Sequence, residues 1–232
     1  MDFEEGVRRF EEFKKSDPIL ASVEVVHIGT AETLERFEVE GAVCQLGSKF
    51  YGEDTSIVEK RRRFYADRGH EYVGLDIEEG IDVDVVADLC HPRFQESYPE
   101  LVGAFAMVIS GALLEHVKDP VAAARNIVAM LAPGGLLYFN GPWVQGFHEY
   151  PDDFWRISIS GIKELFQGLE WLDWCYSGCN GKWGIRVPYP RLERALFLVQ
   201  NGDRENPRNV SELLSDRALT YLMINAWGRK PV

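Results

Sequence analysis

Residues 72–89 read YVGLDIEEGIDVDVVADL, and within them two apolar runs each end on an aspartate, Asp76 and Asp88. Short apolar runs bounded by charged and glycine-containing turns predict strands that helices cover on both faces. In open α/β sheets, ligands bind beyond the carboxyl ends of the strands, where both aspartates would lie. The stretch therefore predicts a parallel sheet with acidic side chains at its ligand-binding edge.

The two aspartates have different expected roles. Asp76 ends the second strand of the predicted sheet, where a carboxylate can accept hydrogen bonds from ribose hydroxyls; the alternative is a solvated turn aspartate. Asp88 would accept the exocyclic amine of an adenine while Leu89 packs on the ring; the alternative is a helix cap or a turn. We favour the nucleoside-binding roles because two acids end two successive strands.

The alternation of strands and helices extends outward from this stretch. AVCQLGS (residues 42–48), AMVIS (106–110) and LLYFN (136–140) are further apolar runs, and a charged helical segment over residues 53–69 follows the first of them. A helix is predicted over residues 119–131, with Asp119 near its start and a Pro-Gly-Gly stop at residues 133–135. The fold class is α/β, with a mostly parallel sheet and helices on both faces.

Residues 1–40 form a preface to this pattern, and residues 41–232 form the main domain. The preface is predicted to contain an amphipathic helix over residues 3–15 and one or two strands, SVEVVHI and LERFEVEG. After residue 156 we predict a helix over 160–168, a strand over 170–178, a surface excursion over 178–216 and a last strand within 218–231. No repeat or linker divides the chain into independent domains.

The overall composition restricts the partners. A formal net charge of -12 and a pI near 4.9 disfavour nucleic acid and anionic membranes. No apolar run reaches the roughly 18 residues that span a bilayer. The four cysteines are scattered, which is typical of buried thiols in a reducing compartment, so we expect a cytoplasmic protein without a zinc site.

The order of four motifs resembles the class I methyltransferases that depend on S-adenosylmethionine (SAM). The motifs are GLDI, VADL, SGALLEHVKDP and LAPGGLLYF, within residues 41–156, and small-molecule and sugar methyltransferases match them best. The resemblance implies a Rossmann-like, doubly wound, seven-stranded sheet whose last strand is antiparallel. It also implies that SAM binds, and leaves as S-adenosylhomocysteine, at Gly47, Ser48, Asp76, Ile77, Asp88, Leu89, Ser110 and Gly111.

The turn after the first main strand departs from the family pattern. The family has an acid and alternate glycines there, whereas this chain has Gln45 in place of the acid and only Gly47 in register. Gly47 still allows a close backbone approach, and Ser48 or Gln45 can hydrogen-bond the methionine portion of SAM. A nicotinamide cofactor is disfavoured, because GxGxxG is absent after this strand.

The segment after the fourth strand carries Glu115 and His116. Some relatives bind a divalent metal here through two acids and a histidine, but Ala112 replaces one of the acids. We therefore predict no metal. The favoured alternative is that Glu115 and His116 shape the cofactor and acceptor pocket or pair locally.

Residues 146–156, GFHEYPDDFWR, resemble an H-x-x-P-x-D-x-W-R element of a subset of these enzymes. His148 is the predicted general base for an acceptor hydroxyl, and Asp152 or Asp153 would orient its ring. The alternative is a lid in which the aromatic residues pack and Arg156 pairs with an acid. The predicted acceptor-binding residues are Glu115, His116, Trp143, Trp155 and Arg156.

These features together predict transfer of a methyl group from SAM to a hydroxyl of a small molecule, such as a sugar, a glycan or a secondary metabolite. An N-methyltransferase of the same fold is one alternative. Another is a catalytically silent protein that binds a nucleoside or serves in an assembly, which the altered glycine turn favours.

Overall fold

The computed structural model describes residues 24–148, 152–178, 183–186 and 222–232, together with Arg8, Glu12 and Lys15. They belong to two compact units. The larger comprises Phe37–Gly141, Phe147–Asp173 and Ala226–Val232, and the other comprises Met1–Arg36, Pro142–Gly146 and Trp174–Asn225. In the described part of the chain, no helix combines the length and the hydrophobicity needed to cross a bilayer.

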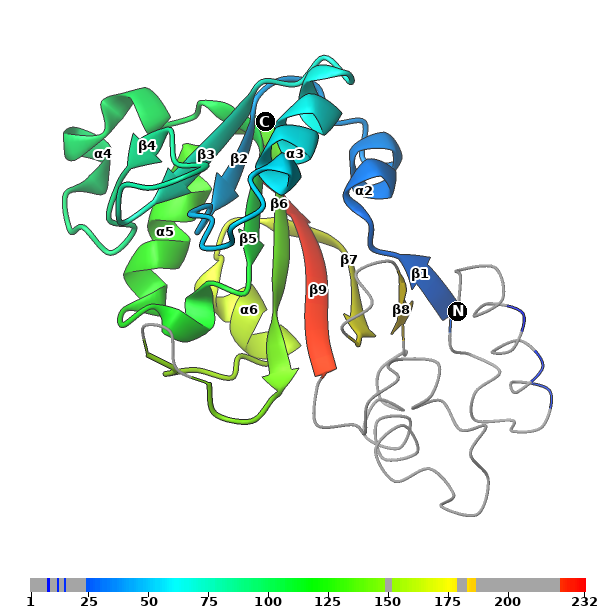
Figure 1. The fold of residues 1–232 in the computed structure, drawn as a ribbon. Helices are drawn as coiled ribbons and strands as arrows, with labels where there is room; N and C mark the ends of the chain where they lie inside the picture. The colour runs from blue at the N-terminus through cyan, green and yellow to red at the C-terminus, as the bar shows by residue number, and fades with distance from the viewer. Residues whose placement is uncertain are drawn as a thin grey trace. The chain divides into compact units, whose positions relative to one another are not determined.

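Parallel strands form the centre of the larger unit, as predicted. Their hydrogen-bonded order is β6-β5-β2-β3-β4, and the register pairs Leu46 with both Leu75 and Ser110 (Figure 1). The chain passes from β2 to β3 in one direction and from β5 to β6 in the other, so a topological switch point lies between β2 and β5. The strands are β2 (Val43–Leu46), β3 (Tyr72–Asp76), β4 (Val85–Val86), β5 (Phe105–Gly111) and β6 (Leu131–Val144).

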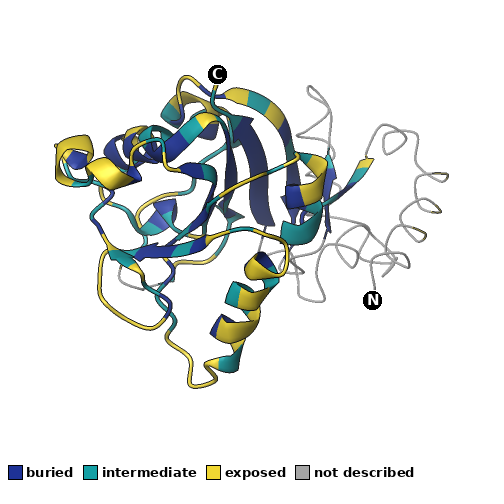
Figure 2. Ribbon diagram, turned by 90° about the horizontal axis from the view of Figure 1, so that it is seen from above, coloured by how far each residue is buried: buried dark blue, intermediate teal, exposed yellow. Residues whose placement is uncertain are grey.

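Helices connect these strands. Because parallel crossovers are right-handed, α3 between β2 and β3 and α5 between β5 and β6 cover opposite faces of the sheet. The strands form the buried layer in Figure 2, and the helices expose their outer sides. The helices are α3 (Ser56–Ala66), α4 (Phe94–Ser97), α5 (Pro120–Met130) and α6 (Ile159–Leu165), with short 3₁₀ turns η2 (Pro99–Leu101) and η3 (Leu114–His116).

The predicted signals at the ends of α5 are present. The Asp119 carboxylate accepts a hydrogen bond from the backbone N–H of Ala122 at 2.9 Å, and Pro120 occupies the first turn. The Pro-Gly-Gly segment lies inside β6, where Gly134 has a φ of +76° and the register with β5 shifts. The segment is therefore a bulge at the start of a strand that begins directly after the helix.

The last strand, β9 (Leu222–Arg229), is confirmed. Lys230, just beyond its end, exchanges backbone hydrogen bonds with Gly134 and Gly135 near the start of β6, at 3.0 and 2.9 Å. The end of β9 thus meets the beginning of β6, so the two strands are antiparallel, as the resemblance implied.

The other unit contains β1 (Glu24–His27), α2 (Thr30–Arg36), β8 (Trp183–Arg186) and the second half of β7 (Glu170–Ser177). Here β1 pairs antiparallel with β8, and β8 pairs antiparallel with β7. The complete strand order, β1-β8-β7-β9-β6-β5-β2-β3-β4, has nine strands, two more than predicted. Of these strands, β1 confirms the strand predicted at SVEVVHI, whereas its partner β8 falls within the predicted surface excursion.

Two local predictions were wrong. LERFEVEG does not form a strand, because its first residues end helix α2, whose buried face contains Thr33 and Leu34. The predicted strand at VDVVADL shrinks to the two residues of β4 and ends before Asp88. The predicted helix over residues 3–15 and most of the excursion over 178–216 lie outside the described residues, and the boundary at residue 40 stays a prediction.

Candidate functional site

The turn after β2 brings the backbone to the switch point. Gly47 has a φ of +61°, and a Cβ placed on it would lie 3.2 Å from Leu113 Cδ1, so this turn contacts the segment after β5. The Ser48 hydroxyl is buried and donates to the Asp82 carbonyl oxygen at 2.7 Å, and the Gln45 amide donates to the Leu46 carbonyl oxygen. The geometry therefore favours an anchoring role for Ser48 over the predicted contact with a ligand.

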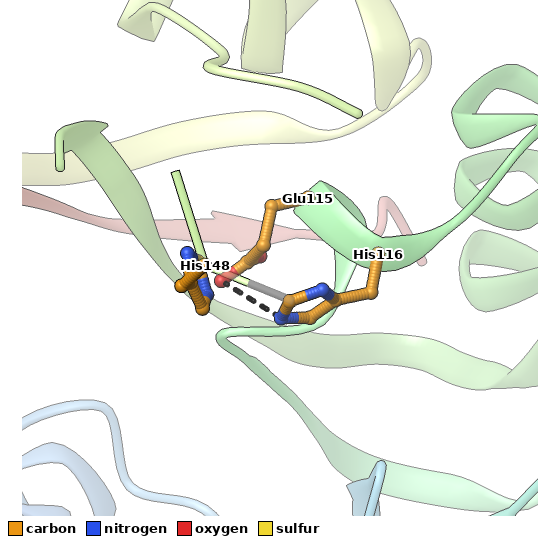
Figure 3. A group of neighbouring side chains, drawn as sticks. All are labelled: Glu115, His116 and His148. Atoms are coloured by element: carbon orange, nitrogen blue, oxygen red, sulfur yellow. Dashed lines mark ion pairs between the residues drawn. The ribbon is translucent and has the colours of Figure 1, made fainter. Parts of the chain in front are cut away.

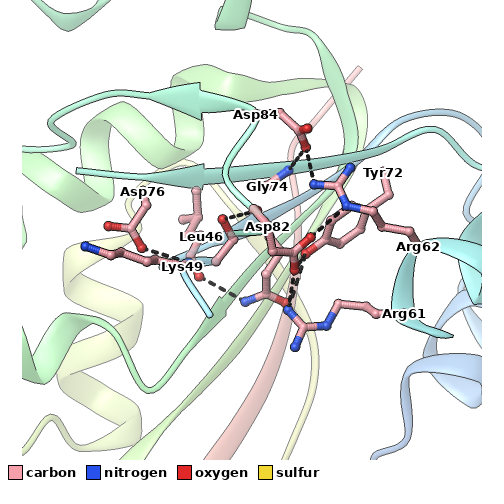
Figure 4. A network of polar contacts seen from close by, with 11 residues as sticks. Leu46, Lys49, Arg61, Arg62, Tyr72, Gly74, Asp76, Asp82 and Asp84 are labelled. Carbon is pink, nitrogen blue, oxygen red and sulfur yellow. Dashed lines mark hydrogen bonds and ion pairs between the residues drawn. The ribbon is translucent and has the colours of Figure 1, made fainter. Parts of the chain in front are cut away.

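Asp76 lies at the carboxyl end of β3, where the sequence predicted it. One carboxylate oxygen accepts the backbone N–H of Lys49 at 3.0 Å, and the other accepts that of Glu78 at 3.2 Å (Figure 4). Because a carboxylate oxygen has two lone pairs, each oxygen can still accept a hydrogen bond from a ligand. The next residue, Ile77, is 64% exposed, an apolar surface beside the acid that suits the face of a base.

A buried ion-pair network that the sequence reading missed supports this edge. Asp82 has a fully buried carboxylate that accepts hydrogen bonds from Arg61 at 2.7 Å, Arg62 at 2.8 Å and the Tyr72 hydroxyl at 3.0 Å (Figure 4). Asp84 accepts hydrogen bonds from Arg62 and from the backbone N–H of Gly74, each at 2.8 Å. In the sequence, the signal for this network was the presence of two adjacent arginines, Arg61 and Arg62, and of an Asp-Val-Asp run over residues 82–84.

This network fixes the loop between β3 and β4. The loop returns to the β2 turn through the Ser48 hydrogen bond and through the Phe50 N–H, which donates to the Ile81 carbonyl at 2.9 Å. Asp82 has a φ of +68°, a strained conformation for a residue other than glycine. The ion pairs therefore position the loop that holds Ser48 beside Asp76.

Asp88 forms a turn in this structure. Its side chain accepts the backbone N–H of Cys90 at 2.8 Å, which is the alternative that the sequence left open. Leu89 is buried, and its carbonyl accepts a hydrogen bond from the Asn126 amide at 2.8 Å. The second Asp88 oxygen can still accept a hydrogen bond, so its contact with adenine stays a prediction.

The carboxyl end of β5 contributes open space and a strained residue. Among the described residues, nothing lies within 4 Å of the position that a Cβ on Gly111 would take, and the hydroxyl of the completely buried Ser110 has no hydrogen-bond partner. Ala112 has a φ of +47°, in the left-handed region. Non-glycine residues in this conformation are found disproportionately at ligand-binding turns.

Three side chains converge beyond this turn. Glu115 and His116 come from η3 and His148 from the loop after β6, and their ligand atoms all lie within 4.8 Å of one another (Figure 3). His116 Nε2 lies 4.0 Å from Glu115 Oε1, and the two imidazole ring centroids are 4.9 Å apart. His116 Nδ1 donates to the Asp152 carbonyl oxygen at 2.6 Å, which leaves Nε2 facing the cluster.

Of the two predicted aspartates, Asp153 is the one whose carboxylate contacts His148. Its Oδ2 accepts the His148 backbone N–H at 2.9 Å and lies 3.3 Å from His148 Nδ1. Arg156 binds both Asp153 oxygens, and its hydrogen bonds hold the pKa of Asp153 well below the usual range. Asp152 is exposed and contributes its main-chain carbonyl oxygen to His116, which replaces the predicted contact of its carboxylate with His148.

Glu115 is the most deeply buried acid of the cluster. It is 3% exposed, and within the described part of the chain its Oε1 has no hydrogen-bond partner. Burial raises the pKa of this carboxyl, while the nearby His116, His148 and Arg156 oppose the rise. A positive charge bound beside Glu115 would therefore stabilise the ionised form of this carboxyl.

The remaining predicted acceptor residues are placed differently. The Trp155 indole donates to the Val117 carbonyl at 2.8 Å, and its ring is partly exposed. The backbone N–H of Phe154 donates to the Glu115 carbonyl at 2.7 Å, so the segment over 152–156 packs on η3. Trp143 belongs to the other compact unit, and its contact with an acceptor stays a prediction.

Comparisons with known proteins agree with this fold. The profile of the methyltransferase-domain family matches residues 50–181. The structure is similar to that of the [4+2]-cyclase SpnF (21% identity, 88% of this chain and 80% of that chain, TM-score 0.51). It is also similar to 1,6-didemethyltoxoflavin-N1-methyltransferase from Burkholderia thailandensis, solved with S-adenosylhomocysteine (12% identity, 87% and 76% covered, TM-score 0.50). A comparison with curated proteins found no match.

Proposed function

This chain belongs to the family of methyltransferase domains, and we propose that it transfers a methyl group from SAM to a hydroxyl group of a small molecule, such as a sugar, a glycan or a secondary metabolite. The family match supports the reaction class. The site at the carboxyl ends of β2, β3 and β5 supports SAM as the cofactor. His148, in the loop after β6, supports a hydroxyl group as the methyl acceptor.

The residues at the switch point fit the cofactor. Asp76 presents two oxygens that can accept ribose hydroxyls, and the exposed Ile77 provides an apolar face beside them. The open space at Gly111 and the left-handed turn at Gly47 let the backbone approach a ligand closely. When bound, SAM supplies a methyl group on a sulfonium, which is electrophilic.

His148 carries the proposal for a hydroxyl acceptor. Its ring nitrogen lies 3.3 Å from a carboxylate that Arg156 keeps ionised, an arrangement that stabilises the imidazolium formed when His148 takes the acceptor's proton. Much of the remaining rate would come from aligning the acceptor oxygen with the methyl group. This pairing of an imidazole with an ionised aspartate is the observation on which the base assignment depends.

An amine acceptor is the second candidate. It draws support from the neighbour named as an N1-methyltransferase, although that likeness extends to the fold alone. A neutral amine needs no base before it attacks, so His148 would then be dispensable for the chemical step. The two candidates thus differ in how much activity depends on this imidazole.

The test is a methyl-transfer assay with a panel of sugars, phenolic metabolites and matched amines, read by mass spectrometry of the products. We expect methylated hydroxyl compounds from the wild type and a loss of product with His148→Gln. Activity on amines alone, undiminished by that substitution, would favour the second candidate. Calorimetry showing that neither SAM nor S-adenosylhomocysteine binds would overturn both.

A further inference from the structure

Glu115, His116 and His148 form a cluster of three side chains that can each bind a metal ion. Two imidazoles and one carboxylate, from η3 and from the loop after β6, point their ligand atoms at a common centre (Figure 3). The sequence predicted no metal here because Ala112 replaces an acid. The structure brings His148, 32 positions after His116 in the chain, into the place of a third ligand.

We propose that Glu115, His116 and His148 bind one divalent transition-metal cation, of the class of Zn²⁺, Mn²⁺ or Fe²⁺. Cation binding is independent of the proposed function, whereas the catalytic role of the cation rests on it. Two imidazoles with one carboxylate suit first-row transition metals, whereas Mg²⁺ and Ca²⁺ prefer sets of oxygen ligands.

The strongest support is the carboxylate of Glu115. Its side chain is 2% exposed and, among the described residues, Oε1 has no hydrogen-bond partner, although an unpaired oxygen on a buried carboxylate is costly. A cation would supply the missing interaction. The nearby positive charge of Arg156 does not replace the cation, because the guanidinium donates two hydrogen bonds to Asp153.

The surroundings of both imidazoles are those of metal ligands. His116 Nδ1 donates to the Asp152 carbonyl oxygen, so the neutral ring carries its lone pair on Nε2, which faces Glu115. His148 Nδ1 lies 3.3 Å from a carboxylate oxygen of Asp153. A hydrogen bond of this kind to a carbonyl group fixes the tautomer and orientation of a coordinating histidine such as His116.

The spacing requires a modest contraction. Ligand atoms that bind Zn²⁺ at about 2.0 to 2.1 Å in a tetrahedron are separated by roughly 3.3 Å, and here they lie within 4.8 Å of one another. If rotation of the side chains moves each ligand atom by about 1 Å, the separations reach the value that Zn²⁺ requires. Three protein ligands leave a coordination position open, as in catalytic metal sites, where a water molecule or an acceptor hydroxyl can bind.

A bound cation would change how the acceptor loses its proton. Coordination occupies the lone pair of His148, so this residue would act as a ligand and not as a base. An acceptor hydroxyl on the cation would have a lowered pKa and would release its proton to water before its oxygen takes the methyl group. The cation and the free imidazole are therefore alternative means of generating the same nucleophile.

The test is calorimetric titration of ZnCl₂, MnCl₂ and MgCl₂ into the chelator-treated full chain. We expect one Zn²⁺ or Mn²⁺ per chain and no binding of Mg²⁺ at the same concentration. Glu115→Gln and His116→Asn should each weaken Zn²⁺ binding at least tenfold, whereas the control His70→Asn, outside the cluster, should leave it unchanged. No Zn²⁺ or Mn²⁺ binding by the wild type, or equal binding by Glu115→Gln, would overturn the site.

Two further measurements keep the result interpretable. If a variant fails to fold by circular dichroism, the visible spectrum of the Co²⁺-loaded wild type serves instead: absorption bands of nitrogen-ligated Co²⁺ support the site, and those of hexaaqua Co²⁺ overturn it. Methyl-transfer assays with and without chelator separate the two proposals. Zn²⁺ binding without transfer to any acceptor would uphold the site and overturn the proposed function, whereas transfer by a chain that binds no cation would do the reverse.

Discussion

Substituting Gly74 by alanine should loosen the loop that supports the cofactor edge. A Cβ on this residue would lie 1.9 Å from the Asp82 carbonyl oxygen and 2.7 Å from Ser48 Oγ, against about 3.5 Å for an ordinary contact. The loop must therefore move by roughly 1.5 Å. That movement breaks the Ser48–Asp82 hydrogen bond and the two that join Gly74 to Asp84, at 2.7, 2.8 and 2.8 Å.

The expected cost follows from these contacts. Three hydrogen bonds at about 1 kcal/mol each, partly remade after the loop relaxes, give a loss of about 2 to 3 kcal/mol in the free energy of unfolding. Urea denaturation measures it, and the midpoint should fall by about 1 M. The control is Gly146→Ala, because nothing lies within 4 Å of its added Cβ and its φ is outside the left-handed region. Equal midpoints for the two variants would refute the reasoning.

Four further outcomes follow from the same contacts. Asp82→Asn, which tolerates the positive φ, should lower the free energy of unfolding by about 2 to 3 kcal/mol in urea, because it leaves two arginines without their buried partner; a loss under about 0.5 kcal/mol would contradict the network. Ala112→Gly should raise that free energy by up to about 1 kcal/mol, and a decrease would argue against strain at this turn. Cys44 and Cys175 should resist alkylation by iodoacetamide at pH 8 until the protein unfolds, because both are fully buried and burial raises the pKa of the Cys44 thiol. Rapid alkylation of the folded protein, measured by mass spectrometry, would contradict the burial of these two thiols. His148→Gln should lower turnover on a hydroxyl acceptor on the order of a hundredfold or more and leave SAM affinity intact, whereas unchanged turnover would remove it as the base.

The parallel core was predictable because its signal is local. An apolar run that ends on a polar residue indicates a strand buried on both faces. Because the strands are parallel, their carboxyl ends lie at the same edge of the sheet, and this placed Asp76 correctly at the end of β3. The capping aspartate of α5 and the antiparallel last strand were likewise confirmed. The strand predicted at VDVVADL was too long because Asp84, near its start, binds Arg62, and this contact depends on α3, which is distant in the sequence.

The candidate site was only partly predictable, for a similar reason. His148, Glu115 and His116 were each singled out, but the sequence does not show that the loop after β6 returns to η3. The choice between Asp152 and Asp153 was also open, since adjacent side chains differ in direction and not in chemistry. The structure places the Asp153 carboxylate, which Arg156 binds, beside His148, and the orienting role of either aspartate stays a prediction.

The most direct test of the central claim, that the edge formed by β2, β3 and β5 binds SAM through Asp76, is calorimetric titration of S-adenosylhomocysteine. Wild type and Asp76→Ala are measured side by side, with circular dichroism confirming that both are folded. Hydrogen bonds to a charged group contribute about 1.5 to 3 kcal/mol, so the variant should bind on the order of tenfold to a hundredfold more weakly at one site per chain. Equal affinity in the two proteins, or no binding to the wild type, would contradict it.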